Sequence, residues 1–218
     1  MRLVAYALSF CFLTTTLLPQ TQVAFLGGLA TPSEAINDVY NTRDIRSGDT
    51  LRSLVREAVR LGYQLGVRTS VALSERFRFL GGISLVRFPT SRLYVTDPQS
   101  GDTLVVLVSV QNLVPICLGI EFVPLPYAVR LSLSTQLSYT ILNSSTDLER
   151  GQISVPLVLG TRNEHRIGVD AGIGLGTQLG PVGLGLEARY AIANLVGRSS
   201  GEGQKRYLSV LLLVALGL

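Results

Sequence analysis

The chain has 218 residues, of which 47% are hydrophobic and only 16% are charged. Soluble domains usually carry about 25% charged residues, so this composition disfavours a water-soluble enzyme, and it excludes a disordered chain, which would be polar and highly charged. The mean hydropathy of +0.38 would suit a helical membrane protein. A membrane-spanning helix, however, needs about 18 or more consecutive apolar residues, and no clean run of that kind follows the N-terminal segment.

The N-terminal residues 1–22 are expected to be a secretory signal. An arginine follows the initiating methionine, residues 3–18 form an apolar stretch, and the polar residues after it interrupt that stretch. An uncleaved N-terminal anchor helix is the alternative. Removing the signal also removes Cys11, so the exported chain keeps only Cys117 and has no internal disulfide. Export without disulfides fits a bacterial envelope better than a small secreted scaffold.

The net charge of +4 is a weak indicator of partners. Eighteen of the nineteen basic residues are arginines and, apart from the second residue, they are scattered between Arg43 and Arg206. A nucleic-acid-binding protein would gather its basic residues on one face, with aromatic residues between them. We therefore expect no nucleic-acid partner, since dispersed arginines suit ion pairs inside the protein at least as well.

A period-two alternation of apolar and polar residues is the clearest pattern in the chain, and it predicts β-strands. Between residues 127 and 141 the odd positions are apolar or tyrosine apart from Thr135, and the even positions are polar apart from Ala128. A helix would distribute both sets around its circumference. The alternation recurs, more weakly in the first and last of these segments, in residues 77–85, 61–74, 104–122, 166–176, 182–193 and 207–218.

The composition of the two strand faces indicates which of them faces lipid. The polar face is dominated by glycine, alanine and serine with a few charges, which fits a narrow, partly hydrated interior. The apolar face consists of leucine, valine and isoleucine, with aromatic residues near strand ends. That arrangement is typical of a transmembrane β-barrel, whose closed wall satisfies every backbone polar group in lipid. A soluble, lipocalin-like binding barrel is the alternative, and it would require the apolar face to point inward.

Eight antiparallel strands are predicted, joined by connections that alternate between tight and long. The strands span residues 22–31, 61–74, 76–89, 103–122, 126–142, 164–178, 181–195 and 205–218. Tight turns are expected at residues 74–75, 123–126 and 179–180, and longer external loops at residues 32–60, 90–102, 143–163 and 196–204. Short periplasmic turns and long external loops are typical of bacterial outer-membrane barrels.

Two segments within the predicted loops have patterns of their own. Residues 152–160 also alternate, but because the strand number of such barrels is even, we assign them to the third external loop as an extension of the following strand. A rival count omits residues 22–31 and inverts the topology. Residues 49–60 have a helical pattern, with apolar residues on one face and arginines elsewhere. They predict a short helix in the first external loop.

Four short motifs follow one another along the predicted strands: FLGGL at 25–29, LSERF at 73–77, LVPICLG at 113–119 and LEARY at 186–190. With these motifs in this order, residues 22–218 resemble the small eight-stranded outer-membrane protein β-barrel domain family. The resemblance implies an antiparallel barrel that the outer-membrane insertion machinery recognises. Barrels of this family tend to end in an aromatic residue that helps this recognition, whereas this chain ends in Leu218.

The sequence carries no motif for catalysis, cofactor binding or metal binding. It has one histidine, His165, and one cysteine outside the signal, too few for a His- or Cys-rich metal site. The glycines of residues 172–176 recur at strand spacing and no helix follows them, as a nucleotide-binding loop would require. Some eight-stranded barrels are lipid A hydrolases with a Ser-His-acid site, but no serine is marked out beside Glu164 and His165. We expect His165 to lie on the outside, near the lipid headgroups.

Charged residues on the polar face are expected to point into the lumen, and outward tyrosines to form an aromatic girdle. The lumen set is Arg68, Glu121, Arg130, Asp170, Glu187 and Arg189, with Arg166 near one rim and Arg76 and Arg78 near the other. The girdle set is Tyr63, Tyr127, Tyr139 and Tyr190. Eight strands leave an interior just wide enough for side chains, and an unpaired buried charge is costly. The charges should therefore pair and plug the lumen; an ion-selective pore or gate is the alternative.

Together these patterns predict an exported protein of the bacterial outer membrane whose barrel domain spans residues 23–218. We expect a monomeric, non-enzymatic barrel without cofactor or metal, in contact with outer-membrane lipids, with a structural or envelope-interaction role. A small-solute, porin-like channel is the main alternative. A lipid-modifying enzyme and a soluble lipocalin-like barrel are the others. The partner of the external loops is left open.

Overall fold

The computed structural model describes residues 21–33, 53–57, 61–96, 100, 102–126, 129–150, 160–198 and 203–217. Most of these residues form nine strands: β1 (Thr21–Pro32), β2 (Ser53–Glu57), β3 (Gly62–Ala72), β4 (Phe77–Thr96), β5 (Thr103–Pro126), β6 (Val129–Arg150), β7 (Gly160–Leu179), β8 (Val182–Val196) and β9 (Arg206–Gly217). No helix among the described residues is long and apolar enough to cross a membrane.

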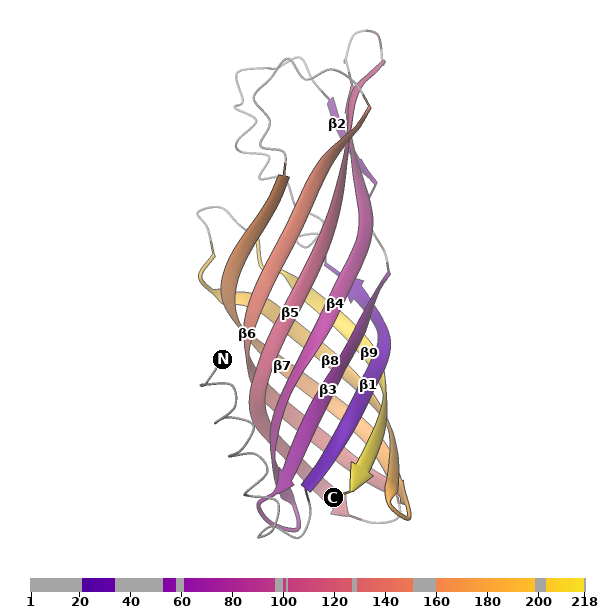
Figure 1. The fold of residues 1–218 in the computed structure, drawn as a ribbon, viewed down its shortest axis with the longest axis vertical. Helices are drawn as coiled ribbons and strands as arrows, with labels where there is room; N and C mark the ends of the chain where they lie inside the picture. Colours follow the sequence, from indigo (N-terminus) through magenta and orange to yellow (C-terminus); the bar gives the residue numbers. More distant parts are fainter. Residues whose placement is uncertain are drawn as a thin grey trace, which may run out of the picture.

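Eight of these strands close into an antiparallel barrel, shown in Figure 1. Strands β3 to β9 pair with their neighbours in chain order, and β1 lies between β3 and β9 and so completes the wall. Closure gives every strand of the wall two partners, which satisfies the backbone groups that an open sheet would leave unpaired at its edges. The predicted fold class, an eight-stranded antiparallel barrel, is confirmed.

The ninth strand, β2, replaces the helix that the sequence predicts at residues 49–60. Its residues, Ser53–Glu57, pair antiparallel with the upper end of β4, from Thr96 to Arg92. The helix prediction is therefore wrong for this segment, and the rest of residues 49–60 lies outside the described residues. A helix this short is marginal unless its apolar face packs against the protein, whereas the exposed edge of β4 offers the segment a ready set of backbone partners.

The burial of side chains along β6 shows which face of the wall is which. The outward residues Leu133 and Leu137 are 44% and 66% exposed, whereas the inward residues Gln136 and Ser138 are 4% and 2% exposed. The apolar face therefore points away from the lumen, as a lipid-facing wall requires. A soluble lipocalin-like barrel would have the opposite arrangement.

The strand boundaries differ from the predicted ones mainly at the end of the barrel that carries the long loops. Strand β4 runs on to Thr96 and β6 to Arg150, so parts of two predicted external loops are strand. The predicted turn at residues 123–126 belongs to β5, where pairing with β6 shifts register between Phe122 and Leu125. Residues 152–159 lie outside the described residues, and β7 begins at Gly160.

The opposite end of the barrel carries tight turns, and it is also where strand β1 begins and strand β9 ends. Ser74 closes the turn between β3 and β4, where its hydroxyl accepts a hydrogen bond from the Phe77 amide. Gly180 turns the chain between β7 and β8 with a φ of 64°, a value that favours glycine because it has no Cβ. Gln22 of β1 pairs with Gly217 of β9 at this same end. We refer to it as the tight-turn end.

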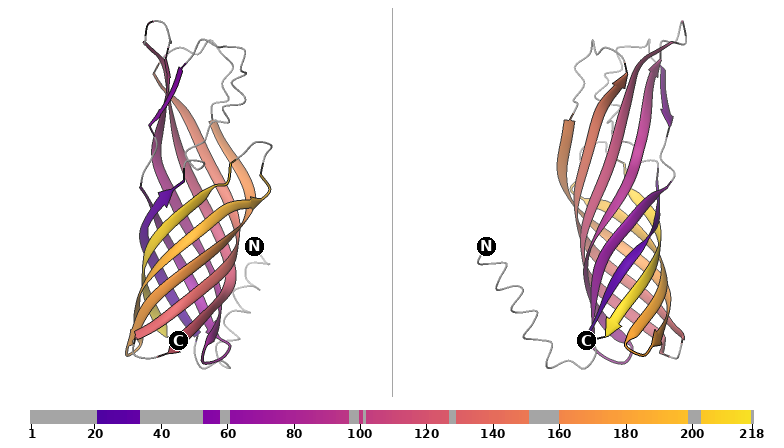
Figure 2. Two further views of the ribbon diagram at one scale, coloured as in Figure 1. Left: turned by 180° about the vertical axis from the view of Figure 1, so that it is seen from behind. Right: turned by 45° about the vertical axis from the view of Figure 1, so that its right-hand side comes forward.

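Four neighbouring strands rise above the rest of the wall at the other end, as Figure 2 shows. Strands β4, β5, β6 and β7 have 20, 24, 22 and 20 residues, whereas a tilted strand crosses a membrane with about 9–11. Each long strand is therefore about twice as long as crossing a membrane requires. We call the part above the rest of the wall the raised sheet: residues 91–96, 103–110, 143–150 and 160–164, together with β2.

Candidate functional site in the barrel lumen

A layer of apolar side chains fills the lumen at its upper end. Its members are buried and come from six of the eight wall strands: Ala30, Val86, Phe88, Leu113, Leu142, Ala191, Ala193 and Tyr207. We call this layer the apolar plug. Because its members point inward from six of the wall strands, the plug extends across the upper lumen.

The two aromatic rings of the plug are in contact, and the two strands between them carry small residues. Phe88 of β4 and Tyr207 of β9 are in edge-on contact, with ring centroids 6.0 Å apart. Strands β3 and β1 lie between them and contribute Gly62 and Ala30, which pair with each other. A Cβ on Gly62 would lie 2.6 Å from the Phe88 ring, so only glycine leaves room for the ring. This large-and-small alternation is how a narrow barrel interior is filled.

A hydrogen-bonded polar belt lies next to the plug along β3. The Gln64 side chain is buried, donates to the Ser84 hydroxyl at 3.1 Å and accepts from the Ser209 hydroxyl at 2.7 Å. Both ends of the amide are thus satisfied, which a buried polar group requires. The belt connects β3, β4 and β9 inside the lumen.

A buried three-membered ion cluster lies below the belt, where β3 faces β8. Arg68 Nη1 donates to Glu187 Oε2 at 2.6 Å, while Arg189 donates to Glu187 Oε1 through Nε at 2.8 Å and Nη2 at 2.6 Å. Glu187 and Arg189 are each 3% exposed. A single carboxylate therefore serves two guanidinium groups, one across the lumen and one on its own strand.

The other three charges assigned to the lumen also point inward, at different levels. Asp170 is buried and accepts hydrogen bonds from the Cys117 thiol and the Ser138 hydroxyl, both at 3.5 Å. Glu121 and Arg130 lie lower, where they line a cavity together with Arg78. The sequence places all six residues on the inner face, but it does not indicate that only three of them form the cluster.

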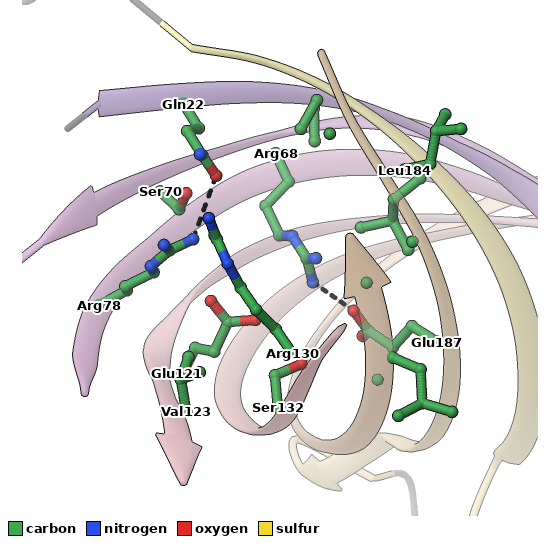
Figure 3. Close-up of a pocket in the computed structure, with 18 of the residues that line it drawn as sticks. Gln22, Arg68, Ser70, Arg78, Glu121, Val123, Arg130, Ser132, Leu184 and Glu187 are labelled. Atoms are coloured by element: carbon green, nitrogen blue, oxygen red, sulfur yellow. Dashed lines mark hydrogen bonds and ion pairs between the residues drawn. The ribbon is translucent and has the colours of Figure 1, made fainter. Parts of the chain in front are cut away.

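The cavity lies at the tight-turn end and is shown in Figure 3. It has a volume of about 100 Å3, and Arg68 and Glu187 of the ion cluster line its upper part. Arg78 Nη1 donates to the Gln22 side-chain oxygen at 3.1 Å. Arg166, by contrast, is at the upper end, where its Nη2 contacts Glu164 at 2.5 Å.

Aromatic residues form two outward groups on the barrel. Three of the tyrosines assigned to a girdle, Tyr63, Tyr139 and Tyr190, are exposed on the outer face, and Tyr127 lies outside the described residues. A second group at the tight-turn end includes Phe77 and Phe122, whose ring centroids are 5.1 Å apart. These phenylalanines are not part of the girdle predicted from the sequence, although an outward aromatic residue at a strand end is typical of a membrane boundary.

The neighbours of His165 differ from those that a Ser-His-acid site requires. His165 is exposed on the outer face, and its Nδ1 lies 2.8 Å from the Tyr139 hydroxyl, with the two rings stacked. No serine of the described residues is hydrogen-bonded to His165, and Glu164 forms an ion pair with Arg166. Among all the residues that the structure describes, no group of three His, Cys, Asp or Glu residues could hold a metal ion.

Known proteins resemble this chain in fold but not in sequence. No protein-family model matches the sequence, and no curated protein matches it. Among solved structures, a major outer membrane protein from Thermus thermophilus is similar over 91% of this chain and 98% of its own, with a TM-score of 0.53 and 13% identity. The chain has the fold of an outer-membrane β-barrel.

Two other solved structures cover the chain equally well at lower similarity. Neisserial surface protein A matches over 91% of this chain and 97% of its own, with a TM-score of 0.49 and 13% identity. Ail, the attachment invasion locus protein of Yersinia pestis, matches over 91% and 98%, with a TM-score of 0.45 and 11% identity. At such identities the similarity concerns the barrel fold alone.

The apolar plug is the feature of this outer-membrane-type barrel that sequence reasoning missed most clearly. Phe88 lies just beyond one of the weakly alternating segments, and Tyr207 begins another, so neither stood out. Leu211 and Leu213 on the inner face of β9 were a visible signal that the lumen is not polar throughout. They are buried and pack with Ala24 and Leu26 of β1 in a second apolar cluster.

Proposed function

We propose that this chain is a protein of the bacterial outer membrane, exported by its N-terminal signal, whose closed and non-enzymatic barrel holds the raised sheet outside the cell. The barrel is the anchor, and the raised sheet is the surface that contacts other components of the envelope or its surroundings. The end with tight turns faces the periplasm, as is usual for such barrels.

The observation that carries the proposal is the apolar plug above the ion cluster. A channel needs a continuous hydrated path, and hydrophobic constrictions close pores by excluding water. Here Phe88 and Tyr207 meet across the upper lumen, and the Arg68–Glu187 pair bridges the lumen below them. This supports a closed barrel over a small-solute channel, the alternative that the sequence left open.

The surroundings of His165 support the non-enzymatic part of the proposal. A Ser-His-acid site needs the histidine to lie between a serine and a carboxylate. The ring of His165 instead meets Tyr139 on the outer face, at a level where amphipathic aromatic groups contact lipid headgroups. The pair fits an anchoring role at the membrane boundary.

The closed lumen is tested by recording from the purified protein in a planar bilayer. We expect the unaltered chain to show no steady conductance. Replacing Phe88 and Tyr207 together with alanine removes the two rings that close the plug and should give brief, small conductance steps. The matched control replaces the outward residues Phe79 and Tyr190 with alanine, which removes the same two ring types and should leave the barrel closed. A steady large conductance of the unaltered chain would overturn the proposal of a closed barrel.

The placement of the raised sheet is tested by labelling single cysteines on intact cells with a membrane-impermeant maleimide. The background is low because Cys117 is buried. Asp147 in the raised sheet and Glu75 at the tight-turn end are both exposed. We expect Asp147→Cys to react on intact cells and Glu75→Cys to react only after the outer membrane is permeabilised. The reverse pattern would mean that the barrel is inserted the other way up.

A further inference from the structure

We propose that the cavity at the tight-turn end of the lumen binds a small phosphate-type oxyanion between Arg78 and Arg130. The site is at the opposite end of the barrel from the raised sheet, so it does not depend on the function proposed for that sheet.

Inward glycines on one side of the wall leave the space that the cavity occupies. Strands β7 and β8 contribute four inward glycines to it: Gly174, Gly176, Gly183 and Gly185. Arginines from β3, β4 and β6 line the same space. The volume of about 100 Å3 holds several water molecules, since one needs roughly 10–15 Å3 by this measure. A tetrahedral oxyanion is the size of a few waters and fits.

The charges around the cavity are unequally paired. Both oxygens of Glu187 are taken, one by Arg68 and one by Arg189. Glu121 is then the one remaining carboxylate among the cavity-lining residues that the structure describes, and it faces two guanidinium groups, those of Arg78 and Arg130. No ion pair joins either of these arginines to a carboxylate of the described residues. An added anion would therefore balance an excess of positive charge.

The donors of the two arginines are available for an anion. Arg78 uses Nη1 to donate to Gln22, and the Gln22 amide in turn donates to Gln178 at 3.5 Å, which holds Arg78 at the mouth of the cavity. Arg130 makes no hydrogen bond within the described part of the chain, and Figure 3 shows its side chain reaching toward Arg78 and Gln22. Guanidinium groups present paired N–H donors that match the oxygens of phosphate.

The position of these residues gives an anion a way in. Gln22, Arg78 and Arg130 are each the second residue of their strand, at the tight-turn end. Entry is therefore from the side expected to face the periplasm, and the ion cluster with the plug above it closes the other side. The oxyanion could be a soluble phosphate or the headgroup of a phospholipid in the inner leaflet, and the experiment below distinguishes these two sources.

The test is a calorimetric titration of the full barrel, folded in nonionic detergent micelles, with inorganic phosphate. We expect saturable binding of one ion per chain. Arg78→Gln and Arg130→Gln should each weaken the affinity at least tenfold. Gly185→Leu should abolish binding with every arginine retained, because its side chain fills the cavity. Heat-modifiable migration in SDS gels verifies that each variant is folded, and Gly185→Ala, whose methyl group meets Leu213 Cβ at 3.6 Å, is the milder form.

The matched control is Arg206→Gln, which removes the same charge from an exposed position at the other end of β9. Its phosphate affinity should equal that of the unaltered chain. Equal weakening by Arg206→Gln, or no saturable binding by the unaltered chain, would overturn the site. Repeating the titration in micelles that contain phosphatidylglycerol identifies the source: competition assigns the site to a lipid headgroup, and unchanged affinity assigns it to a soluble oxyanion.

Discussion

Replacing Glu187 with glutamine is expected to lower the free energy of unfolding of the barrel by about 3–5 kcal/mol, the cost of leaving buried charges without their partner. Arg68 and Arg189 both depend on this carboxylate, at 2.6 Å each. Neither arginine can be deprotonated to escape the penalty. Equilibrium unfolding from phospholipid vesicles measures the effect, followed by circular dichroism because the chain has no tryptophan.

The matched control for this experiment is Glu149→Gln in the raised sheet. Glu149 Oε2 lies 2.9 Å from Arg92 Nε, but both side chains are more than 40% exposed. Exposed ion pairs contribute less than about 1 kcal/mol, so Glu149→Gln should scarcely change the unfolding free energy. If the two variants had equal effects, the burial of Glu187 would not be the source of its contribution.

A second large effect is expected from an arginine placed on the lipid-facing side of β6. Leu133 points outward. It lies near the middle of the stretch of β6 between Val129 at the tight-turn end and Tyr139 of the girdle set. An arginine on the lipid face near the midplane of a transmembrane barrel costs about 2–4 kcal/mol. Leu133→Arg should lower the unfolding free energy in vesicles by that amount.

The same substitution higher on the same strand is the control for membrane depth. Ser145 has the same parity along β6 as Leu133 and so lies on the outer face, but it belongs to the raised sheet. Ser145→Arg should cost less than about 1 kcal/mol, because the cost of an arginine falls toward the interface. Tolerance at Leu133 together with a large loss at Ser145 would mean that lipid surrounds the upper half of the barrel instead.

The outer and inner faces of the wall could be predicted because they depend on a local property. Side chains alternate across a strand whatever it pairs with, so the order of residues such as Leu133 and Gln136 already assigns one to each side. The composition of the two sides then decides which faces lipid. The same local reasoning failed at Ser53–Glu57, because a short segment takes the structure that its neighbour stabilises, and that neighbour is the edge of β4.

The height of the strands could not be predicted to the same extent. Residues 90–96 and 143–150 contain serine, threonine, asparagine and charged residues, a composition that favours loops. In the structure these residues continue β4 and β6, because each finds a partner in β5. The polar composition of these residues suits a segment with water on both sides. Pairing between strands is what makes that segment a sheet.

The sequence by itself determined the barrel class, the lipid-facing surface and the set of charges that point inward, since period and composition are local. Only the tertiary structure decided how the lumen is organised: that Phe88 meets Tyr207 above the charges, that Glu187 serves both Arg68 and Arg189, and that Arg78 and Arg130 are left around a cavity. These residues are far apart in the chain. Their contacts depend on strand register and on which inward positions are glycine, and both are fixed only when the wall closes.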